Sequence, residues 1–100
     1  MAERTYAPPD QHTPPLPESY AAQILRVTAA VLDLHPNAGI DRVTNNAAFD
    51  VAVDAIAGHL PEAVRETATW NAVAAMPAAD GPGTCHWFAD RLRATAGHIG

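Results

Sequence analysis

The stretch GTCHWF, at residues 83–88, holds the side chains of this chain that are best suited to chemistry. It contains the only cysteine, Cys85, directly followed by His86. A thiol beside an imidazole is the pairing of a cysteine nucleophile with its base, and both groups are also zinc ligands. If Thr84 is the N-cap of a helix, Cys85 stands in the first turn, where backbone amides lower the pKa of a thiol. The stretch is therefore a candidate reactive site.

The helical geometry of the same stretch separates the thiol from the imidazole. Consecutive residues point about 100° apart around a helix, so neighbours in sequence do not face each other. Cys85 falls on the apolar stripe of Phe88 and Leu92, and His86 turns to the polar side, near Arg93. Because free cysteine is among the most buried residue types, we expect Cys85 to be structural.

A reactive or metal-binding Cys85 would need another histidine, brought to it by the fold. The candidates are His35, His59 and His98. The histidines do not have the H-x₃-H spacing of a zinc site, and a single cysteine cannot form a C-x₂-C pair. A small-molecule or metal-binding protein that uses Cys85 and these histidines is therefore an alternative hypothesis, and we predict no metal and no cofactor.

Two carboxylates, Asp50 and Asp54, stand four residues apart on one side of a predicted helix. Such a pair can bind a cation or act as acid and base. No third ligand has a matching spacing, so we interpret the pair as two solvated charges. Motifs for phosphate loops and nucleophile elbows are also missing from the sequence, and we predict that the protein is not an enzyme.

Trp87 is the residue of GTCHWF that the apolar stripe does not explain. It lies about 100° from Phe88 around the helix, and Arg91 follows one turn later, within reach of a cation–π contact. Either another element covers the indole, or it is exposed. An exposed tryptophan beside an arginine is a natural anchor for a partner, because both residue types dominate interface hot spots.

Amphipathic patterns and helix-breaking residues divide the chain into four predicted helices. They cover residues 18–34, 46–59, 61–76 and 85–96. Residues 36–45 include turn residues, and the sequence leaves open whether this link is helical or extended. Together these elements predict an all-α fold, a compact bundle or orthogonal array of about four helices.

The predicted domain covers residues 18–100, and residues 1–17 are a proline-rich arm that is flexible or draped on the surface. Proline fixes φ and favours extended polyproline II structure. Within the arm, the PPLP segment with Pro14, Pro15 and Pro17 is suited to docking on an aromatic groove.

Trp70 is the predicted core anchor of the helix over 61–76, because tryptophan has the largest area to bury. It shares its predicted apolar side with small or medium-sized residues, Ala63, Val64, Thr67, Ala68 and Ala74. These small residues predict close packing of that side against a neighbouring helix.

The charge of the chain bears on its partners. The formal net charge is −5, and no local run of basic residues exists, so we do not expect a nucleic-acid partner. The helices over 46–59 and 61–76, with Gly58 between them, nevertheless have about the spacing of a helix-turn-helix. A DNA-binding regulator is therefore an alternative, but it requires a basic patch formed in three dimensions. The arginines that could form it are Arg26, Arg42, Arg65, Arg91 and Arg93.

Sequence features also bear on location. The longest uncharged run, Thr67 to Ala79, is too short to span a bilayer. A signal-peptide pattern is not present, and a lone cysteine cannot form an internal disulfide. These features predict a cytoplasmic protein without membrane contact.

The sequence as a whole favours a small, acidic, non-enzymatic interaction or accessory protein. We expect it to bind a protein partner or a second copy of itself, with a homodimer as the plausible form. The expected contacts come from the helix over 85–96, through Trp87 and Arg91, and from the arm, through Pro14, Pro15 and Pro17.

Overall fold

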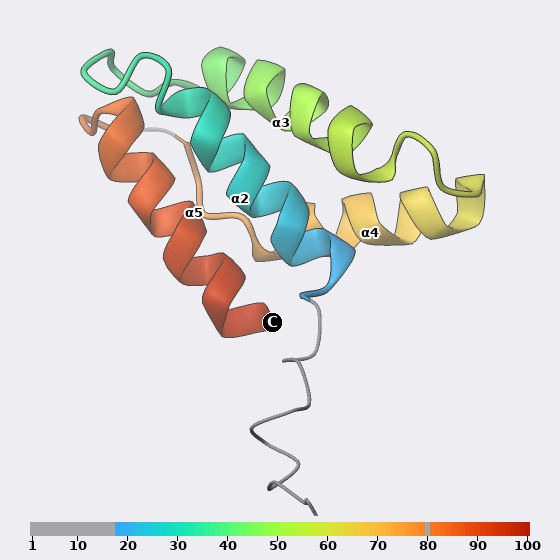
Figure 1. The fold of residues 1–100 in the computed structure, drawn as a ribbon. Helices are drawn as coiled ribbons and strands as arrows, with labels where there is room; N and C mark the ends of the chain where they lie inside the picture. The colour runs from blue at the N-terminus through green and yellow to red at the C-terminus, as the bar shows by residue number, and fades with distance from the viewer. Residues whose placement is uncertain (1–17, 80) are drawn as a thin grey trace, which may run out of the picture.

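The computed structural model describes residues 18–79 and 81–100, and the predicted arm with Pro14, Pro15 and Pro17 lies outside the described residues. Within them the chain folds into four helices and no strand, which confirms the all-α prediction. The helices are α2 (Tyr20–Leu32), α3 (Arg42–Ala57), α4 (Glu62–Ala75) and α5 (Cys85–Ile99). Helix α2 lies between α3 and α5 and also contacts α4, as Figure 1 shows.

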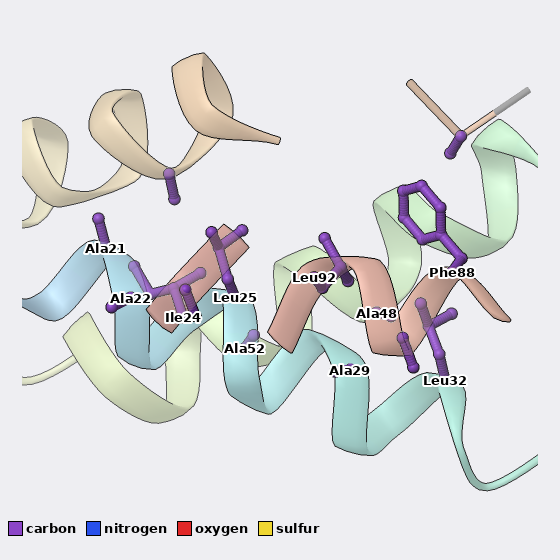
Figure 2. Close-up of a cluster of buried hydrophobic side chains, with 14 of the residues drawn as sticks. Ala21, Ala22, Ile24, Leu25, Ala29, Leu32, Ala48, Ala52, Phe88 and Leu92 are labelled. Atoms are coloured by element: carbon purple, nitrogen blue, oxygen red, sulfur yellow. The ribbon is translucent and has the colours of Figure 1, made fainter. Parts of the chain in front are cut away.

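The core of the array is built around α2 and is rich in alanine. Alanine lets helices approach closely and also favours helix formation. Only a few large side chains fill the space between the helices, and Phe88 is the largest that is fully buried (Figure 2). Thr28 is fully buried as well, and its hydroxyl donates to the Ile24 carbonyl oxygen at 2.8 Å, so its burial leaves no unpaired donor.

Helix α2 begins after the N-cap Ser19, whose hydroxyl accepts from the Ala22 amide at 3.1 Å. It ends at Leu32, two residues before the predicted end, and Leu34 is 72% exposed. The sequence pattern predicts a stripe centred on Ile24, Val27 and Val31, and the buried face is displaced from it because three helices pack around α2. The buried residues of α2 are Ala21, Ala22, Ile24, Leu25, Thr28, Ala29 and Leu32.

Helix α3 starts four residues earlier than predicted. The sequence pattern predicts Asn45 or Asn46 as the N-cap, but the N-cap is Asp41, which accepts from the Thr44 amide at 2.7 Å. Asn45 instead lies in the buried face, where its side-chain amide donates to the Met76 sulfur at 3.1 Å. The large apolar residues, which the spacing of the sequence places on one face of this helix, pack beside the buried face and are only partly buried; they are Phe49, Val53, Ile56 and Leu60.

The prediction for the apolar side of α4 is wrong except at Ala68. Its buried residues are Ala68 and Ala72, whereas Trp70 is 68% exposed and points away from the core. The reason is steric: α4 approaches α2 and α3 through alanines, and a contact this close has no room for an indole. Because alanine occurs on both sides of α4, the hydrophobic pattern could not distinguish the buried side.

Helix α5 continues through Gly97 to Ile99, three residues beyond its predicted end. Gly100 takes the left-handed conformation that glycine favours after a helix, with φ of 69°. Its carbonyl oxygen accepts from the Ser19 amide at 2.9 Å, which ties the end of α5 to the start of α2.

Candidate functional site

The start of α5 is held in place by the link between α2 and α3. The Cys85 amide donates to the Ala38 carbonyl oxygen at 2.7 Å, and the His86 amide donates to that of Pro36 at 3.0 Å. These two amides of the first helical turn are therefore satisfied by protein and not free to bind an anion. The link itself consists of turns and an isolated bridge between Gly39 and Thr84. Residues 36–41 are thus not helical, whereas 42–45 form the start of α3.

Cys85 lies in the core, as predicted. It is 1% exposed, and its sulfur lies 3.9 Å from the Gly39 carbonyl oxygen. Burial raises the pKa of the Cys85 thiol, and the negative charges of Asp41 and Asp33 raise it further. The position therefore favours the neutral thiol, which is a poor nucleophile.

His86 turns away from Cys85 and binds the carboxylates of two helices. Its Nδ1 lies 3.0 Å from Asp33 Oδ1, and its Nε2 lies 3.4 Å from Asp90 Oδ2. Arg93 forms ion pairs with the same two carboxylates. The hydrogen bond that His86 donates to the Asp33 carboxylate raises the pKa of His86, and the charge of Asp90 adds to this effect. We call Asp33, His86, Asp90 and Arg93 the polar cluster; it joins the end of α2 to α5.

The other histidines among the described residues, His35, His59 and His98, do not form a catalytic or metal-binding group with Cys85. His35 borders the same hollow as Cys85, a space of about 560 Å³ with a mainly apolar lining between α2 and α3. His59 and His98 lie at the far ends of α3 and α5 from that hollow. In residues 18–79 and 81–100, no three His, Cys, Asp or Glu side chains are grouped closely enough to hold a metal ion. Asp50 and Asp54 are both exposed.

Trp87 and Arg91 meet as the sequence predicted. The Arg91 guanidinium carbon lies 5.1 Å from the centre of the indole, a cation–π distance. The indole is 46% exposed and lies against the backbone of Gly83. A Cβ atom on Gly83 would stand 2.0 Å from Trp87 Cε3, so only glycine fits beneath the ring. Part of the indole is therefore covered by its own chain, and the rest faces solvent.

Trp70 lies on the surface, although the sequence pattern predicts it as a core residue. It lies on the side of α4 opposite the buried Ala68 and Ala72, and Val73 beside it is 44% exposed. Helix α4 lies at the edge of the array in Figure 1. A hollow of about 470 Å³ opens between α4 and the start of α2, and Tyr20 and Val64 are among its lining residues. The sequence carried no clear signal for the exposure of Trp70, because alanine occurs on both sides of α4.

The arginines of the described residues are spread over several helices, and two of them pair with carboxylates there. Arg26 binds Glu18, with its Nε 2.7 Å from the carboxylate oxygens, and Arg93 belongs to the polar cluster. The solvent-facing side of α4, the would-be recognition helix, carries apolar and acidic residues such as Trp70 and Glu66. This distribution gives no support to phosphate binding by α4.

Comparison with protein-family models, with curated proteins and with solved structures gives no match. Within the described part of the chain, every helix is too short or too polar to cross a lipid bilayer. The function must therefore be argued from the surface of the protein itself.

Proposed function

We propose that this protein is a non-enzymatic interaction protein that binds protein chains, a second copy of itself included, through exposed aromatic anchors. The observation that carries the proposal is the position of its two tryptophans. Trp70 is 68% exposed and Trp87 is 46% exposed, although they are the largest apolar side chains of the chain. The core is built from alanine and a few medium-sized residues instead.

Exposed tryptophans on so small a domain call for a functional reason. Burying an aromatic side chain removes about 150–250 Å² from water, and tryptophan is enriched among the residues that dominate binding energy. A domain that did not use these rings for binding would be more stable with the rings buried in its core. We infer that the two rings lie on the surface of the single chain because a partner chain covers them in complexes.

The two tryptophans play different parts in this proposal. Trp87, with Arg91 over its ring, forms a small aromatic and cationic patch on α5 that suits a partner with aromatic or acidic groups. The predicted contribution of the arm, through Pro14, Pro15 and Pro17, stays part of the proposal. Trp70 offers a larger apolar surface and is the stronger candidate for self-association. The reduced, buried Cys85 suits the proposed cytoplasmic setting.

Sedimentation velocity of the full chain over a range of concentrations tests this proposal. We expect the average mass to rise above that of the monomer with concentration, and the double variant Trp70→Ala, Trp87→Ala to lose this rise while keeping its helicity. A wild-type chain that stays monomeric at the highest concentrations, with the double variant behaving identically, would overturn self-association.

A further inference from the structure

The outer side of α4 carries a short stripe of side chains with a regular spacing. Ala63, Thr67, Trp70 and Ala74 follow one another at intervals of four, three and four residues. At about 100° per residue these positions fall on one side of the helix, and all four residues are exposed. We call them the α4 stripe. The opposite side of α4 packs against the array, so the stripe is the apolar face left without a partner among the described residues.

We propose that the α4 stripe pairs with the α4 stripe of a second copy, with the two helices antiparallel; this inference rests on the proposed function. The spacing of four, three and four reads the same in both directions. Turning α4 end over end about the middle of the stripe exchanges Ala63 with Ala74 and Thr67 with Trp70. The stripe is therefore complementary to itself under a two-fold axis, which is what a closed homodimer requires.

The exchange also matches the sizes of the side chains. Each large indole faces a small Thr67, and alanine faces alanine at both ends, so the helices can lie close together along their length. The hollow of about 470 Å³ beside α4 borders Ala63 and Thr67 and does not receive the partner's indole, because the two-fold axis places both indoles on the same flank of the paired helices. A chain's own Trp70 points away from this hollow, because it lies on the other flank of the stripe.

Charge does not oppose this pairing. The stripe contains no charged residue, and Val64 and Val73, which flank it, are 40% and 44% exposed. Pairing therefore desolvates apolar surface without burying an ion. Glu62 and Arg65 lie away from the stripe, and Glu66 lies at its edge, where it can stay in contact with water.

The apolar area that the pairing can bury determines how strongly we expect two copies to associate. An aromatic side chain buries about 150–250 Å², so Trp70 has roughly 150 Å² left to bury, and the whole stripe with its flanks has roughly 400 Å². Two copies would bury roughly 800 Å², which is less than the about 1,200 Å² of standard stable interfaces. We therefore expect a weak dimer that forms at high protein concentration and depends strongly on Trp70.

Disulfide trapping in the full chain tests the orientation. Ala63→Cys and Ala74→Cys are prepared as two separate single variants, oxidised alone and as an equal mixture, and analysed without reductant. In the antiparallel pair, position 63 of one copy lies beside position 74 of the other, within disulfide reach. Two copies of position 63 are about 16 Å apart along the helix, and so are two copies of position 74. The wild-type chain, whose Cys85 is buried, is the control for unrelated linkage.

We expect linked dimer from the mixture, and little from either variant alone or from the wild type. Efficient linkage of each variant with itself would indicate parallel helices and overturn the proposal. If sedimentation shows a dimer but none of the samples links, the α4 pairing is overturned while self-association stands. If sedimentation shows no association at any concentration, the proposed self-association itself has failed.

Discussion

Ala72 is fully buried in α4, whereas Trp70, two residues earlier in the same helix, leaves 68% of its surface in solvent. The two side chains lie on opposite sides of α4, so the helix packs through its smallest residues and displays its largest. For an isolated domain, leaving the indole in solvent forgoes the favourable free energy of burying it. The arrangement becomes favourable if the surface of α4 is covered in a complex.

Gly83→Ala is expected to displace the Trp87 indole. The added Cβ would stand 2.0 Å from Cε3 of the ring, so the ring must swing outward and lose its contact with the backbone and with Arg91. In a Trp70→Phe background, where Trp87 is the only tryptophan, the emission should shift to longer wavelength. The domain should be destabilised by about 1 kcal/mol.

Gly39→Ala is the matched control for this change. A Cβ on Gly39 meets no atom within 4 Å, and neither glycine has the positive φ that excludes alanine. The control should leave the emission of Trp87 unchanged. An unchanged emission in Gly83→Ala as well would show that the ring does not rest on Gly83.

The polar cluster predicts how stability depends on pH. Because the Asp33 carboxylate raises the pKa of His86 above its ordinary value of about 6.5, protonated His86 stabilises the fold. This contribution is fully present below the pKa of the unfolded state and is lost as the pH rises through the raised pKa of the folded state. The Arg93 guanidinium and the His86 imidazole both lower the pKa of Asp33, so the Asp33 carboxylate stays charged throughout this range.

Titration of His86 by NMR, with Asp33→Asn as the comparison, checks this prediction. The pKa of His86 should lie above the ordinary histidine value in the wild type and fall in Asp33→Asn. Urea unfolding of the wild type should show stability decreasing as the pH rises through the folded pKa of His86, and the variant should show a smaller decrease. A wild-type pKa of His86 at or below 6.5 would contradict the cluster.

The native Cys85 thiol is expected to react slowly. It is 1% exposed, and burial raises its pKa, so both access and thiolate formation are unfavourable. Labelling with a thiol reagent at neutral pH should be much slower for the native chain than for the chain in denaturant. If the native chain is labelled as fast as the chain in denaturant, Cys85 is accessible and the hypothesis of a reactive thiol is supported.

Local sequence signals predicted much of the fold. The hydroxyl of Thr84 marked the start of α5, and the pattern through Phe88 and Leu92 placed Cys85 in the core. The start of α3 was missed because Asp41, Asn45 and Asn46 are all good N-cap residues, and only tertiary packing buries Asn45.

The surface features depend on contacts that a single sequence does not display. Asp33 and Arg93 are 60 residues apart, so the polar cluster becomes visible only when α2 and α5 are placed side by side. The exposure of Trp70 was predicted wrongly for a related reason. Hydrophobic patterning assumes that the bulkiest side chain faces the core, and in α4 the close approach to α2 selects alanine instead.

The most direct test of the account compares Trp70→Ala with Leu34→Ala by sedimentation velocity. Both change exposed apolar side chains, 68% and 72% exposed, but only Trp70 lies on the α4 stripe. We predict that the wild type and Leu34→Ala associate alike at high concentration, and that Trp70→Ala associates about tenfold or more weakly with unchanged helicity by circular dichroism. Association of Trp70→Ala at the wild-type strength would contradict a dimer built on α4.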